Sequence, residues 1–561
     1  MLSRSQALDA VGAEPFDVVV IGGGITGAGV ALDAASRGYS VALVERDDYA
    51  VGTSSRSSKM VHGGLRYLQN FDLGLVREAL LERQLMVQLA PHLVYPTPFL
   101  IPTLGEDRRD RRYSVGLNMY DVMATTRVGR SRRERAARER SEDYWAPHRH
   151  RQIPGEEVVE LIPALAPREP SSAYLFYDCQ TDDVRLVLTT LGEAERFGAV
   201  CVNGAEVTGL IEDDGRAAGV ECIDTSSGER FEVRGANVVN ATGVWADRIR
   251  PEEIEDEEDV PRISPSRGTH VTFSLEHAPM KAACIVPAGE SRTIFVLPWC
   301  GRALVGTTDN DYDGDISRVR PGSDDIDYLL DAVNSFFGLE LGPDDLTGAF
   351  AGVRPLIATG DPRKSVDISR RAELYETSSG LLTITGGKLT TWRRMAKQVV
   401  DRMVEREGRE APCRTADIPL GMAARPEDLE LPDTLPADDL PEGALEQLTF
   451  RYGYAARNVL AVAGENNDLA GPIAEGRPDI LAEAVIAARL EQARTVADVL
   501  LRRTRLGIVA APQLRDARSV RPVAEAMGSE LGWDRRRVRR EADAWVEAGK
   551  AEGVDPAADV T

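Results

Sequence analysis

The chain has 561 residues, of which 43% are apolar and 28% are charged, and this composition predicts a globular protein of roughly two to four domains. Its formal net charge of −23 argues against nucleic acid as a partner, because a phosphate backbone requires a basic surface. The six cysteines form no C-x-x-C pair, and we find neither a signal segment nor an apolar run of transmembrane length, so we expect a cytosolic protein without a metal site.

Residues 17–45 predict a β–α–β unit that binds a dinucleotide. An apolar strand leads into the turn Gly22-Gly23-Gly24-Ile25-Thr26-Gly27, a helix follows, and a second strand ends at Glu45. In such a unit Gly22 allows the tight turn, Gly24 lets the backbone approach a pyrophosphate, and Gly27 lets helix and strand pack closely. The N–H groups at the helix start favour the pyrophosphate. Glu45 is placed to accept the ribose hydroxyls, which favours FAD or NAD over NADP.

Further elements follow in chain order. A hydroxyl-rich loop spans residues 52–59, and an amphipathic helix is predicted over residues 75–90. Strands are predicted at 199–202, 237–243, 293–299, 303–306 and 381–387. The strand that ends at Gly243 and the turn at Gly386-Gly387-Lys388 are each typical of a segment that returns to the same cofactor.

The C-terminal part differs in composition. Residues 405–443 alternate prolines with acidic residues and predict a linker, and residues 480–506 and 523–550 have a helical pattern, so we expect residues 444–561 to form a helical domain. Residues 252–259 are acidic and predict an exposed loop. Arginines cluster at residues 108–151 and 535–540, and each cluster is either a solvated helix face or a contact for anionic lipid headgroups.

The motifs taken together resemble the FAD-dependent glycerol-3-phosphate dehydrogenases of the single-chain aerobic type. Residues 21–38 resemble the first signature of that family, and residues 53–68, from Thr53 through Lys59 and His62-Gly63-Gly64 to Leu68, are similar to the segment that follows it. Similar motifs occur in family order at 178–186, 240–245, 268–270, 298–299, 306–309, 352–355 and 386–391. The chain departs from the family at Trp392, where a tyrosine is usual. Residues 500–504 resemble the family's helical domain more loosely.

This resemblance implies an α/β fold in which a Rossmann-type FAD-binding domain is combined with an interleaved antiparallel β-sheet cap domain and an all-α C-terminal domain. Residues 1–404 would form the oxidoreductase region. The expected FAD-binding segments are roughly 15–85, 180–260, 300–310 and 375–404, and the expected cap segments are roughly 86–179, 261–299 and 311–374.

The family's activity is the oxidation of sn-glycerol 3-phosphate to dihydroxyacetone phosphate by hydride transfer from C2 to FAD, with the electrons passed to a membrane quinone. The resemblance implies substrate contacts at Arg66, Tyr67, His270, Arg354, Arg370 and Lys388. It implies cofactor contacts at Gly22, Gly24, Ile25, Thr26, Gly27, Glu45, Thr53, Ser54, Ser58, Lys59, His62, Gly63, Gly64, Leu65, Ala241, Thr242, Gly243, Gly387, Lys388, Leu389 and Thr390.

The reaction also needs a base for the hydroxyl proton and cations for the developing negative charge. Histidine suits a base near neutral pH, and His270 is the first candidate and His62 the second. Arg66 and Lys388 are placed to stabilise the alkoxide and the reduced flavin. Without the family, each histidine is interpreted more simply as a structural residue, and each arginine as a surface residue.

Several alternatives stay open at this point. An oxidase that reduces dioxygen to hydrogen peroxide, an amine or amino-acid oxidase, and a flavin-bearing regulatory protein all fit the same fold. The lack of a cysteine cluster argues against the multi-subunit anaerobic type. The family implies a peripheral position on the inner face of the cell membrane, and the helical domain also suits the formation of a homodimer.

Overall fold

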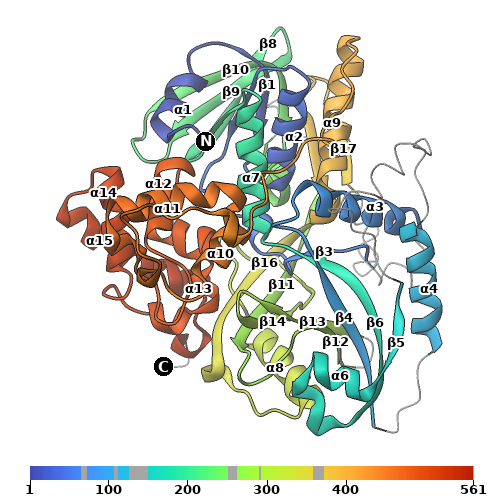
Figure 1. Cartoon of the computed structure of the whole chain (residues 1–561). Coiled ribbons are helices and arrows are strands. Elements are labelled where there is room, and N and C mark those ends of the chain that lie inside the picture. The colour runs from blue at the N-terminus through green and yellow to red at the C-terminus, as the bar shows by residue number, and fades with distance from the viewer. Residues whose placement is uncertain are drawn as a thin grey trace.

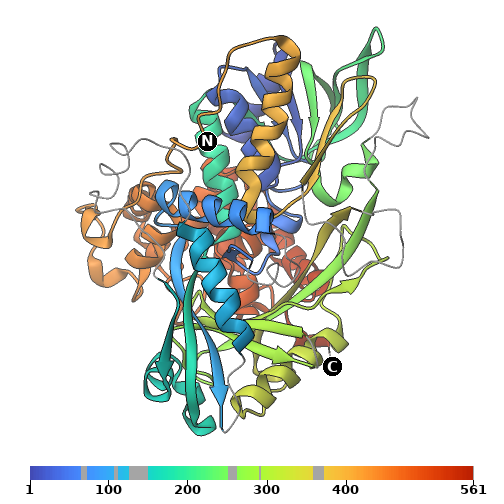
Figure 2. The ribbon, with the colours of Figure 1, turned by 90° about the vertical axis from the view of Figure 1, so that its right-hand side faces the viewer.

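The computed structural model describes residues 1–64, 73–105, 111–125, 149–249, 262–289, 292–357 and 372–559. Two β-sheets lie one above the other, and the C-terminal helices from α10 onward pack beside them (Figure 1). The N-terminus lies near the upper sheet, and the chain after α15 (Arg535–Glu552) ends near the lower one (Figure 2). Within the described ranges, no helix is long and apolar enough to cross a membrane.

The first sheet has the order β17-β18-β10-β1-β2-β7, and β9 and β8 extend it from β10. β1 pairs in parallel with both β10 and β2, as the β–α–β pattern predicts. Its strands are β1 (Phe16–Ile21), β2 (Val41–Val44), β7 (Val200–Val202), β8 (Ala205–Asp213), β9 (Arg216–Asp224), β10 (Arg230–Asn240), β17 (Ala372–Glu376) and β18 (Leu382–Gly386).

Both faces of this sheet are covered, which explains why β1 is apolar at successive positions. Val18 and Val20 pack against the helices α2 (Ile25–Ser36), α7 (Asp183–Arg196) and α9 (Trp392–Glu407). Val19 and Ile21 point to the other face, where they pack against residues of β8, β9 and α1 (Arg4–Val11).

The second sheet has the order β15-β11-β14-β13-β12-β4-β6-β3, with β16 paired to β11 and β5 paired to β6. Its pairs are antiparallel except for β12 with β4. The strands are β3 (Met60–Val61), β4 (Tyr95–Leu104), β5 (Arg151–Pro154), β6 (Pro170–Gln180), β11 (Ile263–Ser274), β12 (Ala283–Ala288), β13 (Arg292–Trp299), β14 (Arg302–Gly306), β15 (Asn310–Asp311) and β16 (Leu346–Ile357). Helices α6 (Gly155–Leu161) and α8 (Ser323–Phe337) pack on it. The predicted fold class, with two interleaved sheets and a helical C-terminal region, is confirmed.

Two of the expected cofactor segments contain strands of the second sheet. Residues 300–310 form β14 and the start of β15, and they belong to the second sheet because β14 pairs with β11 on one side and β13 on the other. β3, inside the expected segment 15–85, also belongs to the second sheet through its pairing with β6. The predicted helix over residues 75–90 is α3 (Leu73–Leu89), and α4 (Arg111–Thr125) packs against it. The acidic residues 252–259 lie outside the described residues.

The proline-rich segment after α9 connects two regions and is mostly exposed, but several of its apolar residues are buried. Ile418 and Leu420 are buried with α2, α7 and α9, and the Leu420 N–H donates to the carbonyl of Leu89 at 2.7 Å. Leu429 and Leu435 are buried in the core of the helical region. The apolar residues between the prolines therefore fix the segment to both of its neighbours.

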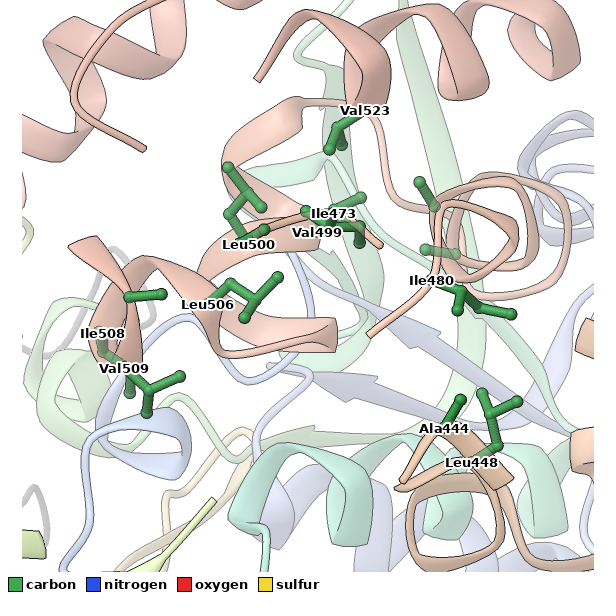
Figure 3. Close-up of a cluster of buried hydrophobic side chains, with 14 of the residues drawn as sticks. Ala444, Leu448, Ile473, Ile480, Val499, Leu500, Leu506, Ile508, Val509 and Val523 are labelled. Atoms are coloured by element: carbon green, nitrogen blue, oxygen red, sulfur yellow. The ribbon is translucent and has the colours of Figure 1, made fainter. Parts of the chain in front are cut away.

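The helical region has one apolar core, part of which Figure 3 shows around Leu448, Ile480 and Leu500. The same core continues into Trp299, Leu304 and Phe350 of the second sheet, so the helices are attached to that sheet by buried apolar contact. The predicted helix over residues 480–506 is interrupted after Leu490 and resumes as a π-helical turn. The helices are α10 (Ala444–Tyr452), α11 (Ala456–Glu465), α12 (Ala482–Leu490), the π-helical turn Asp498–Arg503, α13 (Leu506–Val509), α14 (Arg521–Leu531) and α15 (Arg535–Glu552).

Candidate active site

The glycine turn between β1 and α2 has the geometry that a dinucleotide requires. Gly22 has a φ of +109°, in the region that favours glycine, and it lies against the backbone of Ala241. A β-carbon at Gly27 would lie 1.9 Å from the carbonyl oxygen of Gly22. Gly24 precedes α2 directly, and the N–H of Ile25 at the helix start donates to the Ser54 hydroxyl at 3.0 Å, so Ser54 lies where the helix start faces an anion.

We expect Gly27→Ala to abolish most of the binding of a nucleotide cofactor. The clash is with backbone rather than with a flexible side chain, so the turn or α2 has to move. The matched control is Gly12→Ala, where an added β-carbon meets no atom within 4 Å and φ is −95°. The measurement is the molar ratio of flavin to purified protein. Equal ratios in the two variants would contradict this role for Gly27.

A cavity of about 520 Å³ runs from the glycine turn to the second sheet. Residues from both sheets line it, so one elongated ligand in this cavity contacts both. Of the residues expected to bind cofactor, those that line the cavity are Gly22, Gly24, Ile25, Thr26, Glu45, Thr53, Ser54, Ser58, His62, Ala241, Thr242, Gly243, Gly387, Lys388, Leu389 and Thr390.

Glu45 lies in the cavity wall and braces the glycine turn. Its carboxylate accepts hydrogen bonds from the N–H groups of Gly23 at 2.7 Å and Asp47 at 2.9 Å. Burial raises the pKa of Glu45 to about 7. The carboxyl group therefore helps to hold the turn in place in addition to the ribose contact that the sequence predicts.

His270 lies on β11, opposite Gly306 of β14 and Phe350 of β16. Its imidazole stacks on the Phe350 ring with 4.7 Å between centroids. A β-carbon at Gly306 would lie 2.2 Å from the imidazole Cδ2, so glycine at this position leaves the space for the ring. Nε2 is 2.9 Å from the hydroxyl oxygen of Ser58.

Three effects keep the His270 imidazole neutral near neutral pH. Burial is the largest, and the positive charges of Lys59 and Arg354 act in the same direction, so the pKa of His270 is well below its usual value. Nδ1 is buried and has no hydrogen-bond partner among the described residues. A neutral imidazole can take up a proton, which is the property a general base needs.

Arg354 enters the cavity from β16 beside the strand that carries His270. Its guanidinium donates to Asp309 Oδ1 at 3.0 Å, to Thr307 Oγ1 at 3.0 Å and to the Thr308 carbonyl at 3.1 Å. Gly268 gives it room, because a β-carbon there would lie 2.5 Å from Nη2. A fixed, one-quarter-exposed guanidinium at a cavity wall is suited to binding an anion.

His62 and Lys388 reach the same cavity from other segments. The backbone of His62 is fixed by Thr390, whose hydroxyl accepts from the His62 N–H and donates to the His62 carbonyl, each at 3.1 Å. Lys388 follows the Gly386-Gly387 turn, where both glycines have positive φ. Four of the expected site residues, Leu65, Arg66, Tyr67 and Arg370, lie outside the described residues.

Lys59 was expected to bind cofactor, and the structure places it elsewhere. Its side chain is fully buried and does not line the cavity, and Nζ donates to Asp183 Oδ2 at 2.8 Å and to the Ser55 carbonyl at 2.6 Å. The preference of a buried ammonium for a carboxylate explains this position. Gly27, Gly63 and Gly64 also lie outside the cavity lining, and Gly63 packs against Leu80 and Tyr120.

Trp245 and Arg46 are among the cavity residues that the sequence did not assign to the site. Trp245 lines it, and its indole N–H is buried without a hydrogen-bond partner among the described residues. Arg46, next to Glu45, lies over the Trp245 ring at 5.2 Å and also lines the cavity. Trp245 ends the motif at residues 240–245, so the motif was the available signal.

Comparison with known proteins agrees with this geometry. Residues 17–393 match the family model described as FAD dependent oxidoreductase, and residues 382–538 match the C-terminal domain of alpha-glycerophosphate oxidase. Glycerol-3-phosphate dehydrogenase 2 of Mycobacterium tuberculosis is 37% identical over 556 residues, which cover 98% of this chain and 90% of that protein. The chain belongs to the FAD-dependent glycerol-3-phosphate dehydrogenase family.

Two further members of this family give the same picture. The mitochondrial glycerol-3-phosphate dehydrogenase SDP6 of Arabidopsis thaliana is 34% identical over 570 residues, and the aligned region covers 96% of this chain and 86% of that protein. The crystal structure of the Bacillus halodurans glycerol-3-phosphate dehydrogenase complexed with FAD superposes with a TM-score of 0.74 at 27% identity, and covers 98% of this chain and 97% of that one.

FAD is the cofactor of this family, and the residues present here fit it. Gly22 and Gly24 of the turn line the cavity without side chains that would fill the pyrophosphate position, and Glu45 and Trp245 line it beside them. The cavity then continues to His270 and Arg354, where a substrate would meet the far end of the cofactor. In the parts of the chain that the structure describes, we find no group of side chains able to hold a metal ion.

Proposed function

We propose that this protein oxidises sn-glycerol 3-phosphate to dihydroxyacetone phosphate and passes the electrons to a membrane quinone. The observation that carries the substrate assignment is that a neutral histidine, His270, and a fixed guanidinium, Arg354, border the cavity that begins at the FAD-type glycine turn. The names of the related dehydrogenases support the same substrate.

The residues divide the work between binding and proton transfer. A phosphomonoester carries close to two negative charges at neutral pH, and Arg354 binds it with donors held in a fixed direction. His270 takes the proton of the C2 hydroxyl while Ser58 orients its ring. Lys388 places a positive charge where negative charge develops. When bound, FAD supplies the acceptor for the C2 hydride.

The quinone and the membrane are supported by the surface of α4. Val115 and Val122 are 61% and 62% exposed, and their spacing of seven residues places them on one face of the helix. Tyr120 of the same helix accepts from the Gly63 N–H at 2.9 Å, so α4 lies beside the turn that follows His62. We therefore place this face on the inner surface of the cell membrane, with the protein peripheral to it.

Most of the first arginine cluster, at residues 108–110 and 126–148, lies outside the described residues. The second cluster is less suited to the surface of α4. Arg535, Arg536, Arg539 and Arg540 are exposed on α15, which lies on the other side of the molecule from α4 (Figures 1 and 2). Because the two helices lie on opposite sides of the molecule, a flat membrane contacts only one of them. Of the two, α4 is the helix near the cavity. The homodimer expected from the sequence stays a prediction.

Anaerobic titration with glycerol 3-phosphate tests the function. We expect one equivalent to bleach the flavin absorbance, because each substrate donates two electrons and FAD accepts two. A soluble quinone analogue should then restore the absorbance with little hydrogen peroxide in air-saturated buffer. Rapid reoxidation by air with matching peroxide would favour the oxidase, and a folded, FAD-loaded protein that does not bleach would exclude this substrate.

A further inference from the structure

A buried cluster of charges joins the helical region to the loop at residues 52–59. Arg505, which directly precedes α13, donates through Nη2 to Asp183 and to the Ser55 carbonyl, the latter at 3.2 Å. Lys59 donates to the other oxygen of Asp183 and to the same carbonyl. Asp182 lies 3.6 Å from Arg505 Nε. Two cations and two carboxylates thus balance in a site that is almost completely closed to water.

This cluster fixes the chain on both sides of Ser58. The hydroxyl and the N–H of Ser57 donate to Asp183 at 2.7 and 3.2 Å, and Lys59 is held by the ion pair described above. Ser58 lies between them, and its hydroxyl is 2.9 Å from His270 Nε2. Lys59 also lies over the Phe350 ring, at 4.7 Å, and that ring is the one on which His270 stacks.

The backbone at both cations supports a constrained arrangement. Lys59 has a φ of +59° and Arg505 a φ of +67°, in the left-handed region that a β-carbon disfavours. Such conformations persist where the surrounding contacts hold them, and they cluster at functional sites. Both of these residues share Asp183 as their carboxylate partner. The apolar residues Leu500 and Leu506 anchor the Arg505 segment in the helical core (Figure 3).

We propose that Arg505 is a positioning residue for the oxidation of glycerol 3-phosphate. From the helical region, Arg505 holds Asp183 and the backbone of residues 55–59. Because that backbone carries Ser58, the Ser58 hydroxyl keeps the His270 imidazole oriented. The inference rests on the proposed function, because His270 is the base there. It assigns the helical region a part in the chemistry, since Arg505 contacts the loop that carries Ser58 without lining the cavity itself.

The competing explanation is that Arg505 only stabilises the fold. Removal of one member of a buried ion cluster destabilises any protein, because the remaining charges lose their partner. Arg503 separates the two explanations. It lies in the same segment, is equally buried, and pairs with Asp48 and, at 3.5 Å, with Glu491. Neither its ion pairs nor its hydrogen bonds involve residues 52–59. Arg503→Gln therefore removes a similar ion pair without touching the Ser57–Lys59 contacts.

The experiment compares Arg505→Gln, Arg505→Lys and Arg503→Gln as FAD-loaded proteins. The measurements are the flavin content, the melting temperature, and the rate constant of anaerobic flavin reduction over a range of glycerol 3-phosphate concentrations. For Arg505→Gln we expect the rate constant at saturation to fall on the order of 10- to 100-fold, because misplacement of a reacting group by about 1 Å costs that much. The half-saturating concentration should stay within about threefold, since the phosphate contact to Arg354 is untouched.

The controls decide between positioning and stability. Arg505→Lys restores one cation and should regain part of the lost rate, whereas Arg503→Gln should lower the melting temperature but keep the saturating rate within about twofold of wild type.

Equal rate losses in Arg505→Gln and Arg503→Gln, or an unchanged rate in Arg505→Gln, would overturn the proposal. If Arg505→Gln does not fold, Arg505→Lys decides: a reduced rate with unchanged half-saturation supports positioning, and the wild-type rate overturns it. A wild-type protein that glycerol 3-phosphate does not reduce would instead refute the proposed function.

Discussion

We expect His270→Gln to slow the reduction of bound FAD by glycerol 3-phosphate on the order of 10²- to 10⁴-fold, the usual contribution of a positioned general base. Glutamine has a similar length and retains a hydrogen-bonding group near Ser58, but it cannot take up the hydroxyl proton. Binding should change little, because the phosphate is held by Arg354. The measurement is stopped-flow bleaching of the flavin under anaerobic conditions at saturating substrate.

The matched control is His277→Gln, three residues beyond the end of β11, where the histidine is exposed and outside the cavity. Its rate should equal that of the wild type. A His270→Gln rate close to wild type would contradict the assignment and make His62 the base to test next. Because the pKa of His270 is lowered, its protonation occurs only well below pH 6.5, so the base should remain active across neutral pH and be lost on acidification.

Local pattern was sufficient to predict the cofactor unit. The apolar run before Gly22, the glycine spacing and the acid at Glu45 are all encoded within one short segment, and β1, α2 and β2 follow it closely. The strands that return to the same sheet, β10 and β18, were also recognisable because each ends in small residues next to a turn. The family resemblance then supplied His270 and Arg354, which no periodicity singles out.

What the sequence did not predict depends on contacts between distant residues. Lys59 stands in a loop full of hydroxyl groups, and only its pairing with Asp183, 124 residues later, removes it from the cofactor. Residues 300–310 form a short apolar strand whose sheet is decided by its neighbours β11 and β13, not by its own composition. The link from Arg505 to Ser55 spans 450 residues, and in a chain this rich in arginine no local feature distinguishes it.

Arg354→Gln should weaken the binding of glycerol 3-phosphate by about 2–5 kcal/mol, the usual cost of truncating one partner of a desolvated charge pair. Every 1.4 kcal/mol is about a tenfold change in the dissociation constant, so this loss is easily resolved in a titration. The guanidinium is held by Asp309 and Thr307 before substrate arrives, so little ordering cost offsets the gain on binding. The rate of flavin reduction at saturation should fall less than the affinity, because the base is still in place.

Arg267→Gln is the control for this variant, because Arg267 lies on the paired strand β11, has the same 24% side-chain exposure as Arg354, and makes a comparable ion pair with Asp325 at 3.0 Å. It does not line the cavity, so its loss should leave the affinity for glycerol 3-phosphate unchanged. If the two variants weaken binding equally, the effect comes from the packing of this sheet rather than from a phosphate contact. A further comparison with glycerol, which lacks the phosphate, locates the interaction. Arg354→Gln should reduce the preference for glycerol 3-phosphate over glycerol, because only the phosphorylated substrate carries the negative charge that Arg354 binds.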